Sequence, residues 1–341
     1  MTISSLTPTI ADVAKRAGVS IATVSRVLTG STPVNGETAN RVQAAIDALN
    51  YVPRSAARML ASRRTNTIGL LLPEIGGWFF PSMLRGIEAA ARQAGFDLLI
   101  HTVDVSYPLK TSRRALGMHN TDGLIVFTNS VGDDELFYLQ KNGFPIVLLH
   151  QTPPANLNIP VITIENKTGA QKIVDHLIEV HGCRRIAFLQ GPKGQEDSEW
   201  RERGYRESLE THGIPYDENL VANGGFDEHE AAAAVSQWLL DGLDFDAIFS
   251  GDDDTALGVF TAFQRAGRLI PDDVAVVGFD DVPLARFMSP PLTTVRAPTE
   301  QVGRDAVKQL VRLIRGEQTD PITLLPTELV IRNSCGCRLS T

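Results

Sequence analysis

The residues best suited to recognise another molecule by direct hydrogen bonding lie near the start of the chain. Val24, Val27 and Leu28 recur at helical spacing, which leaves a second set on the opposite, outer face, namely Ile21, Ala22, Ser25 and Arg26. An arginine presents a planar fork of donors that matches the edge of a guanine, and small neighbours let a helix lie in the major groove of DNA. The pattern favours a DNA-reading helix, although an ordinary helical hairpin in a bundle shows the same spacing.

Two short helices joined by a tight turn would position this outer face. Thr9 can cap the first helix, and Asp12 at its third helical position suits the positive end of the helix. Gly18 stands where the chain must reverse, because glycine enters left-handed conformations without a steric cost. Ser20 can cap the second helix. This order of elements is the plan of a helix-turn-helix domain.

A third helix completes the predicted domain. Asn35 can cap a helix from about Glu37 to Asn50, and the apolar stripe of this helix would close a small core through Val42, Ala45, Ile46 and Leu49. Tyr51-Val-Pro53 ends the helix, because a residue before proline is pushed out of the helical region. We therefore expect a helix-turn-helix DNA-binding domain over residues 1–53.

Several polar residues beside the outer face are further candidate DNA contacts. Ser25, Thr23 and the backbone amides near Ser20 are expected to hold phosphates, which set the register on DNA without specifying its sequence. Thr9 and Asn35, at the starts of the first and third helices, complete this group.

A short basic segment follows the domain. Residues 54–65 are compatible with a helix but have little apolar surface, and an isolated helix of this length is marginal in water. We expect this hinge helix to become ordered only on DNA and beside its symmetry mate. Ala57, Arg58 and Leu60 are its candidate DNA contacts, with Leu60 as a wedge between base steps in the minor groove. The alternative for Leu60 is a linker leucine that packs on the rest of the chain.

The distribution of charge supports a nucleic-acid partner for one part of the chain only. The whole chain holds 32 Lys and Arg residues against 40 Asp and Glu residues, a net charge of −8. Residues 1–64 hold eight basic and three acidic residues and are therefore positive, whereas the remaining residues carry a net charge of −13. A positive N-terminal segment followed by a negative remainder is the charge distribution expected when only one domain of a protein binds phosphates.

These segments resemble the lactose-repressor/galactose-repressor (LacI/GalR) family of bacterial transcription regulators. The resemblance rests first on the string from Thr9 to Arg26, the Tyr51-Val-Pro53 turn and the Ala56-Ala-Arg-Met-Leu60 hinge. It continues through the body over essentially residues 9–334, in motifs such as Thr67-Ile-Gly-Leu-Leu-Leu-Pro73, Val274-Ala-Val-Val-Gly-Phe-Asp-Asp281 and Pro326-Thr-Glu-Leu-Val-Ile-Arg332.

The resemblance implies a sequence-specific repressor that is controlled by a small-molecule effector. Family members of this kind bind near-palindromic operator DNA, here with a central C-G step that Leu60 of each subunit would enter. Two-fold pairing is expected, because one head buries too little surface for high affinity. The tail from Cys335 lacks the leucine heptads of tetrameric members, so we expect a homodimer.

After Arg64, apolar runs that read as strands alternate with helical stretches. Several runs are continuously apolar, as in parallel strands that are covered on both faces, so the predicted fold is α/β with doubly wound parallel sheets. The resemblance implies two lobes like those of periplasmic sugar-binding proteins, with chain crossings near Ile164, Ala297 and Leu325. The expected core covers residues 66–338, with one lobe at about 66–164 and 298–325 and the other at about 165–297 and 326–338. The predicted strands and helices are Ile68–Leu72, Pro81–Ala94, Asp97–His101, Gly123–Phe127, Ile146–Leu149, Val161–Ile164, Asn166–Val180, Ile186–Leu189, Trp200–His212, Leu220–Ala222, His229–Asp241, Ala247–Phe249, Thr255–Ala266 and Val274–Gly278.

Doubly wound sheets bind ligands beyond the carboxyl ends of their strands, so the cleft between the lobes is the expected effector site. Trp78, Phe79 and Phe80 follow the first strand and could stack on a sugar ring, unless they belong to the core. The resemblance places Arg201 and Asp280 on the effector, and Phe226 is a plausible second wall. The alternative for Asp280 is a helix cap or a salt bridge between the lobes.

Three positions depart from the family pattern. Asp252 stands where an amide is commoner, His150 where many sugar-responsive members have an aspartate, and Glu165 where an aspartate is usual. Because these changes alter donors, charge and geometry, the identity of a relative's effector does not transfer. We expect a sugar or sugar derivative, although a ligand with extra donors or a cationic ligand stays open.

Several features are missing from the sequence. There is no leading apolar segment and no apolar run long enough to span a membrane, so we expect a cytoplasmic protein without a membrane partner. Cys335-x-Cys337 could bind a metal or sense redox state but has no further ligands nearby in the sequence, and the histidines show no metal-ligand spacing. We expect no metal, no cofactor and free thiols.

Two other functions stay open at this point. One is a solute-binding protein of a transport system, which the basic head and the missing export signal disfavour. The other is an enzyme that uses Asp252, Asp253, Asp254 or His150, although a run of acids at this place more often caps the following helix. For the regulator, closure of the lobes on a ligand would change the hinge spacing and hence operator affinity. Induction and co-repression both stay open.

Overall fold

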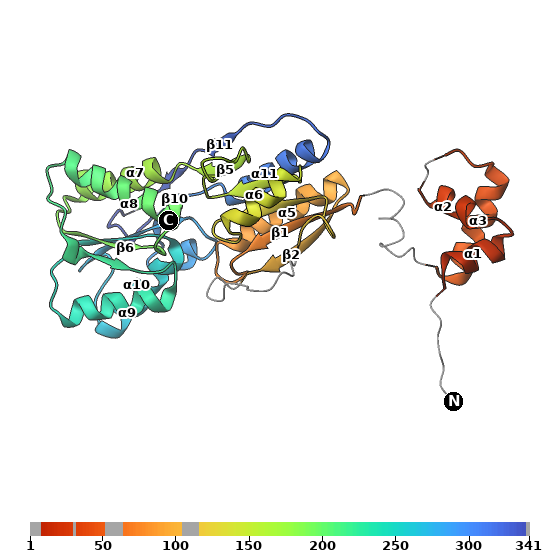
Figure 1. Ribbon diagram of the computed structural model, residues 1–341. Coiled ribbons are helices and arrows are strands. Elements are labelled where there is room, and N and C mark those ends of the chain that lie inside the picture. Colours follow the sequence, from red (N-terminus) through yellow and green to blue (C-terminus); the bar gives the residue numbers. More distant parts are fainter. Residues whose placement is uncertain (1–7, 30–31, 52–63, 104–115, 339–341) are drawn as a thin grey trace. The chain divides into compact units, whose positions relative to one another are not determined.

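The computed structural model describes residues 8–29, 32–51, 64–103 and 116–338 (Figure 1). The chain separates into two compact units, Met1–Asn66 and Thr67–Thr341, which are called here the head and the body. The predicted hinge contacts Ala57, Arg58 and Leu60 lie outside the described residues.

Three helices form the head, and their ends follow the predicted capping residues. They are α1 (Ile10–Ala17), α2 (Ile21–Thr29) and α3 (Gly36–Leu49). Thr9 and Asp12 form a reciprocal capping box at the start of α1, and Gly18 ends this helix with a φ of 65°. The Asn35 side chain accepts a hydrogen bond from Glu37 N, so α3 begins one residue earlier than predicted.

The core of the head joins all three helices. Val13, Val24 and Val42 are completely buried, one from each helix, and Tyr51 packs with them. Arg41 contributes to the basic charge of the head, and its side chain also has a structural role. Its Nη2 donates to the carbonyl oxygens of Ala17, at 2.5 Å, and Gly18, at 3.2 Å. Arg41 of α3 therefore fixes the turn between α1 and α2.

The body contains two six-stranded sheets. The first has the strand order β11-β5-β4-β3-β1-β2, and all its paired strands are parallel. Its strands are β1 (Thr67–Leu72), β2 (Asp97–Thr102), β3 (Gly123–Phe127), β4 (Ile146–Leu149), β5 (Val161–Ile164) and β11 (Ile322–Leu325). The continuous apolar runs of β1, β3 and β4 are buried along nearly their whole length, as expected for parallel strands covered on both faces.

The second sheet has the order β12-β10-β9-β8-β6-β7. Its strands are β6 (Ile186–Gln190), β7 (Val221–Asn223), β8 (Ala247–Ser250), β9 (Ala275–Asp280), β10 (Thr293–Arg296) and β12 (Glu328–Val330). The edge strand β12 runs antiparallel to β10, whereas the other paired strands of this sheet are parallel, as expected for a doubly wound sheet. The chain passes from one sheet to the other after Ile164, after Arg296 and after Leu325.

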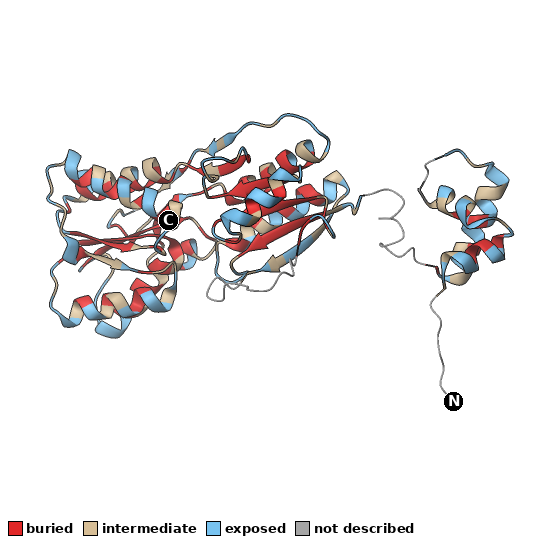
Figure 2. Cartoon of the chain, viewed as in Figure 1, coloured by how far each residue is buried: buried red, intermediate tan, exposed pale blue. Residues whose placement is uncertain are grey.

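Helices cover both faces of each sheet and expose their outer faces to solvent (Figure 2). The first lobe has α5 (Phe80–Ala94), α6 (Asp133–Lys141) and α11 (Thr299–Ile314), and α5 packs on α11. The second lobe pairs α7 (Asn166–His181) with α8 (Glu196–Thr211), and α9 (Glu228–Leu240) with α10 (Asp253–Ala266). Short 3₁₀ turns occupy Glu218–Leu220 and Ala285–Phe287. Every helix in the described ranges is too short or too polar to cross a bilayer.

Among the helices that were predicted, the largest shift of a boundary lies at the start of α8. This helix begins at Glu196, four residues before the predicted start at Trp200, because the acidic residues Glu196 and Asp197 suit the positive end of a helix. Helices α6 and α11 and strands β10 and β11 were not among the predicted elements, and β7 was predicted one residue early.

Candidate effector site and DNA-reading face

The outer face of α2 is open to solvent in the head. Ile21 exposes 51% of its surface, and Ala22 and Arg26 are exposed as predicted. Ser25 and Thr23 are half-buried. The helix therefore exposes Ile21, small side chains and one guanidinium group on this face, a combination that suits contact with a major groove.

The predicted phosphate contacts also stabilise the head itself. Ser20 Oγ accepts a hydrogen bond from Thr23 N at 3.1 Å, which caps α2. Thr9 Oγ1 lies 2.7 Å from the Asp12 carboxylate, and Asn35 caps α3. Contacts of these residues with DNA stay predictions.

In the body, the two sheets bring their topological switch points to the same place. In the first sheet the strand order reverses between β1 and β3, and in the second it reverses between β6 and β8. A crevice forms beyond the carboxyl ends of the strands at such points, and ligands of open α/β sheets bind there. The segments that follow these four strands carry the polar groups described next.

Arg201 is the centre of a buried polar network in the second lobe. It is 2% exposed, and its three guanidinium nitrogens donate in different directions. Nε bonds Asn166 Oδ1 at 2.9 Å, Nη1 bonds the Gly251 carbonyl at 2.7 Å, and Nη2 bonds Asp280 Oδ1 at 3.1 Å. The guanidinium carbon also lies 3.8 Å from the centre of the Phe279 ring. Arg201 and Asp280 therefore meet, as the resemblance implied, but they also form a salt bridge with each other.

His150 extends this network into the first lobe. It follows β4, and its Nδ1 lies 2.8 Å from Asp197 Oδ2 in the first turn of α8. The other carboxylate oxygen of Asp197 accepts a hydrogen bond from Asn166 Nδ2 at 2.7 Å. Burial raises the pKa of Asp197, but the charge and hydrogen bond of His150 and the charge of Arg201 outweigh burial, so the net shift is downward. The carboxylate of Asp197 is thus held ionised at the boundary between the lobes.

Three further contacts join the lobes around His150 and Asp197. Thr152 donates to both carboxylate oxygens of Glu196, from N at 2.7 Å and from Oγ1 at 2.9 Å. Trp78 N donates to Asp254 Oδ2 at 3.1 Å. Asn129 Nδ2 reaches the Gly194 carbonyl at 3.5 Å. The lobes are therefore in polar contact through loops from both sides of the cleft.

The acidic run Asp252–Asp254 has mainly structural partners. Asp252 caps α10 by accepting from Thr255 N at 2.8 Å, as expected for such a run. Asp253 accepts from Thr294 Oγ1 at 2.6 Å and from Val282 N at 2.9 Å. Burial, together with repulsion from Asp280, raises the pKa of Asp252 to about 7. The same two causes raise the pKa of Asp254 to about 6, although the hydrogen bond from Trp78 N acts in the opposite direction.

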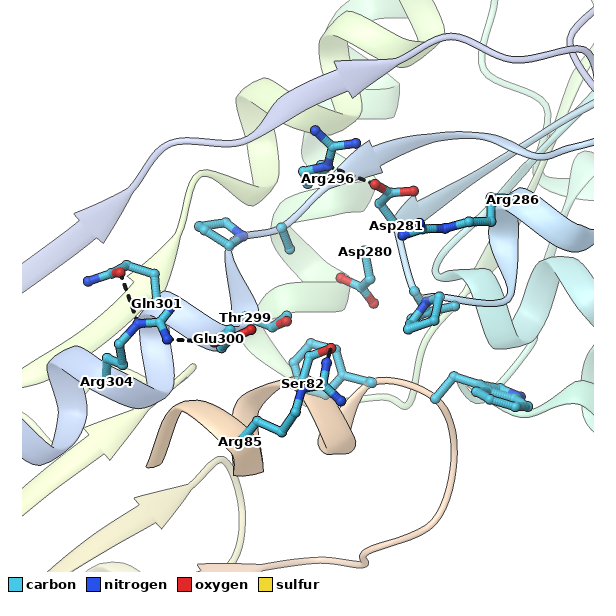
Figure 3. Close-up of a pocket in the computed structure, with 16 residues that line it drawn as sticks. Ser82, Arg85, Asp280, Asp281, Arg286, Arg296, Thr299, Glu300, Gln301 and Arg304 are labelled. Atoms are coloured by element: carbon cyan, nitrogen blue, oxygen red, sulfur yellow. Dashed lines mark hydrogen bonds and ion pairs between the residues drawn. The ribbon is translucent and has the colours of Figure 1, made fainter. Parts of the chain in front are cut away.

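A pocket of about 410 Å³ opens beside this network (Figure 3). Trp78, Phe79 and Arg85 line it from the first lobe, and Asp280 and Arg286 line it from the second. In Figure 3, the Asp280 carboxylate faces the pocket, and Arg296 is paired with Asp281 at 2.7 Å. Aromatic, acidic and guanidinium groups therefore meet in one pocket between the lobes.

The three consecutive aromatic residues have different positions. Trp78 is 45% exposed and lines the pocket together with Phe79. Phe80 begins α5 and is 7% exposed in the hydrophobic core, where its ring lies 5.3 Å from that of Phe127. The assignment of Phe80 to the effector is therefore corrected, because the first turn of α5 directs its side chain into the core.

Other predicted and unpredicted residues lie in the network next to the pocket lining. His150, Arg201 and Asp252 are buried there, and Phe226 lies 5.4 Å from the Arg201 guanidinium carbon. Asn166 and Asp197 also belong to the network and were not among the predicted site residues. An acidic pair at a helix start was the signal for Asp197, but the predicted start of α8 at Trp200 excluded it.

Backbone strain is concentrated at the cleft. Positive φ angles are rare for residues other than glycine and have an energetic cost. The described residues include seven of this kind, and five of them stand at or shortly after strand ends near the cleft, namely Asn129, His150, Phe226, Asp280 and Asp281. Strained conformations of this kind persist at sites where the surrounding structure needs a particular side-chain direction.

Buried polar atoms without partners are found at the same strand ends. These atoms are Oγ of Ser130, which lies shortly after β3, Oγ of Ser250, the last residue of β8, and Nε2 of His150, which directly follows β4. None of these atoms makes a hydrogen bond within the described part of the chain. Since buried polar groups are normally hydrogen-bonded, such atoms indicate a place for a polar ligand or for water.

A second group of side chains corrects the expectation about metals. His176, His181, Cys335 and Cys337 lie together in the second lobe, so Cys335 and Cys337 do have further possible ligands nearby. Spacing in the sequence did not reveal this group because the fold joins residues that are far apart in the chain, and whether the group binds a metal stays untested.

Comparison with known proteins identifies the family. Residues 9–54 match the model of bacterial regulatory proteins of the lacI family, and residues 174–335 match a periplasmic binding protein-like domain. The ribose operon repressor of Halalkalibacterium halodurans is 36% identical over 328 residues, which cover 96% of each chain. The chain belongs to the lacI family of bacterial regulatory proteins. It is a DNA-binding transcription regulator, and the helical head and two-lobed α/β body are confirmed as the family's fold.

Further relatives of this lacI-family regulator have been characterised in sequence and structure. The transcriptional regulator CelR of Thermobifida fusca is 35% identical over 336 residues, covering 96% of this chain and 98% of that protein. A structure of a CelR–cellobiose complex has a TM-score of 0.68 at 33% identity, covering 96% of this chain and 99% of that one. The lac repressor dimer bound to operator and the anti-inducer ONPF has a TM-score of 0.81 at 26% identity with the same coverage.

Proposed function

We propose that this regulator is a homodimeric repressor whose affinity for a near-palindromic operator is set by a carbohydrate bound between the lobes. The exposed outer face of α2 supports operator recognition, with Arg26 as the residue that reads a guanine. Exposed Leu99 and Ile100 on the edge strand β2 support a dimer interface in the first lobe. In this proposal the protein works in the cytoplasm, where its operator is, and catalyses no reaction.

The observation that carries the effector proposal is the set of unpartnered buried atoms at the carboxyl ends of β3, β4 and β8. Ser130 Oγ, Ser250 Oγ and His150 Nε2 can each donate or accept a hydrogen bond. Asp252 adds a carboxyl group whose pKa of about 7 lets it act as a donor or as an acceptor near neutral pH. A polyhydroxylated ligand needs such mixed partners, because each of its hydroxyl groups both donates and accepts.

The walls of the pocket agree with the same class of ligand. The exposed Trp78 ring offers an apolar face on which a sugar ring can stack, while Asp280 offers acceptors to its hydroxyl groups. The printed names of relatives include a ribose operon repressor and a CelR–cellobiose complex, and we extend the carbohydrate class, not the individual sugar, to this chain.

Closure of the lobes provides the link between effector and DNA. The first turn of α8 holds Thr152 and His150 of the other lobe through Glu196 and Asp197. β1 of the first lobe begins at Thr67, directly after the segment that leads from the head. A ligand that favours the closed lobes therefore changes the geometry at the origin of the hinge in both subunits of the dimer.

Two measurements test this proposal together. Thermal unfolding of the full chain is screened against pentoses, hexoses, disaccharides, polyols and nucleosides, and a specific carbohydrate is expected to raise the midpoint. Operators are selected from a random duplex pool with the same protein, and fluorescence anisotropy then measures their affinity with and without the stabilising sugar. A change in operator affinity at constant salt is expected. A chain that prefers no duplex but binds a sugar would instead be a solute-binding protein.

A further inference from the structure

Two histidines and two cysteines meet in the second lobe. His176 and His181 lie in the last two turns of α7, and Cys335 and Cys337 lie in the turn after β12. One ligand atom of each residue lies within 4.8 Å of those of the other three. Cys335 is buried and the other three are half-buried. The cluster is separate from the effector network. Helix α7 contributes its first residue, Asn166, to the network, whereas His176 and His181 of the cluster lie in its last two turns. A rise of about 1.5 Å per residue places His176 about 15 Å along the helix from Asn166.

Three distances within the cluster match edges of a tetrahedron around a zinc ion. His176 Nε2 and His181 Nε2 are 3.3 Å apart, and Cys337 Sγ lies 3.7 Å from the first and 3.4 Å from the second. Zn–N bonds of about 2.05 Å and Zn–S bonds of about 2.3 Å place two nitrogens about 3.3 Å apart and a nitrogen and a sulfur about 3.6 Å apart. A proton shared between two of these atoms accounts for one short distance at a time, whereas a central cation accounts for all three.

The turn between the cysteines is built to approach the histidines. Gly336 has a φ of 102°, and a Cβ at this position would lie 3.3 Å from His181 Nδ1. Glycine therefore provides both the backbone conformation and the close approach. Thr293 Oγ1 donates to Cys335 Sγ at 3.1 Å, a contact of the kind that orients metal-ligating groups from outside the ligand shell.

We propose that His176, His181, Cys335 and Cys337 bind one Zn²⁺ ion in a closed structural site. Four protein ligands of the Cys₂His₂ type leave no position for substrate, which is typical of structural zinc. The ion would tie the end of α7 to the turn after β12, and it would stabilise the second lobe without contacting the effector.

The protonation states of the ligands are compatible with this chemistry. Burial lowers the pKa of His176 and His181, which favours the neutral imidazoles that bind metals. Burial raises the pKa of the Cys337 thiol to about 11, so the thiol is protonated without a cation. Binding of Zn²⁺ forms two Zn–N and two Zn–S bonds and releases the two thiol protons to water, which leaves a centre without net charge.

Zinc content and cobalt spectroscopy on the full chain test the proposal. The purified protein, loaded with Zn²⁺ and passed through a desalting column, is expected to retain about one zinc ion per chain, measured by atomic emission. Cys337→Ser and His181→Gln should each lose this ion, while the matched variants Cys183→Ser and His229→Gln should keep it. Removal of zinc from the wild-type chain with a chelator should lower its unfolding midpoint by several degrees, and added zinc should restore it.

Cobalt gives an answer that does not depend on the folding of any variant. Co²⁺ bound to the wild-type chain should show the intense visible bands of a tetrahedral centre and near-ultraviolet bands from thiolate ligands. A weak octahedral spectrum, zinc retention by the Cys337 and His181 variants equal to that of the controls, or a wild-type chain that retains no zinc would each overturn the proposal. In these cases the cluster is held only by hydrogen bonds between thiol and imidazole groups.

Discussion

His150 Nδ1 lies 2.8 Å from Asp197 Oδ2, and this contact joins the end of β4 in one lobe to the first turn of α8 in the other. The same imidazole leaves its Nε2 buried without a hydrogen-bond partner in the described structure. One side chain thus connects the closure of the lobes to a place where a ligand hydroxyl group can bind. In the proposed function, effector binding and lobe closure are coupled through this residue.

Replacing His150 should therefore weaken the response to the effector. His150→Asn is the suitable variant, because His150 has a φ of 58° and asparagine tolerates this left-handed conformation. Loss of the contact to the charged Asp197 should cost about 1.5–3 kcal/mol, so we expect at least tenfold weaker effector binding in isothermal titration calorimetry. Operator affinity without effector should stay the same. Effector affinity equal to that of the wild type would show that His150 does not couple closure to binding.

Replacing Arg26 should reduce discrimination between DNA sequences. Arg26→Ala removes the guanidinium group from the outer face of α2 and should lower specific operator affinity by about 1–3 kcal/mol, while most non-specific binding is kept. Lys15→Ala is the control, because it removes an exposed positive charge from α1. Anisotropy titrations against the selected operator and against random duplex, at one salt concentration, measure both. An equal loss on the two duplexes would exclude base reading by Arg26.

Replacing Asp252 should change how stability depends on pH. Burial raises the pKa of Asp252 to about 7, so between the unfolded value of about 4 and this value the folded state binds more protons than the unfolded state. The stabilisation from this group is complete at low pH and is lost as the pH rises through 7, with a slope of at most about 1.4 kcal/mol per pH unit for one proton.

Asp252→Asn keeps a side-chain oxygen that can cap α10 but removes the titration. The free energy of unfolding, measured with urea from pH 5 to pH 8, should therefore fall less steeply in this variant than in the wild type. Asp241→Asn, at the end of α9, is the control for loss of one negative charge. If the two variants have the same pH dependence, Asp252 does not titrate in this range.

Replacing Arg201 should destabilise the second lobe because of the charge that it leaves behind. Arg201→Ala removes the partner of Asp280, which is 6% exposed, and breaking a buried ion pair in this way costs about 3–5 kcal/mol. Asp280→Asn in the same chain removes the unpaired carboxylate and should recover part of this loss. The comparison of single and double variants by urea unfolding gives the coupling between the two residues. Losses that simply add would mean that the pair contributes no coupling energy.

Much of the fold follows from short stretches of sequence. Thr9, Gly18 and Asn35 fix helix ends through contacts within a few residues, so their roles were predictable from residue type and spacing. The continuous apolar runs of β1 and β3 likewise report burial on both faces of a sheet. The residues of the outer face of α2 were predictable because the helical spacing of its apolar residues identifies the buried face and therefore also the exposed one.

Only the tertiary structure showed the features that depend on contacts between residues far apart in the sequence, namely the pocket lining, the polar network and the His–Cys cluster. Phe79 and Phe80 are adjacent, yet one lines the pocket and the other is in the core, since the start of α5 sets their directions. Asp197 meets His150 because α8 begins at Glu196, and His181 meets Cys337 although they are 156 residues apart in the chain. Local propensity and periodicity carry no information about such pairs, because the packing of the lobes alone determines which side chains come together.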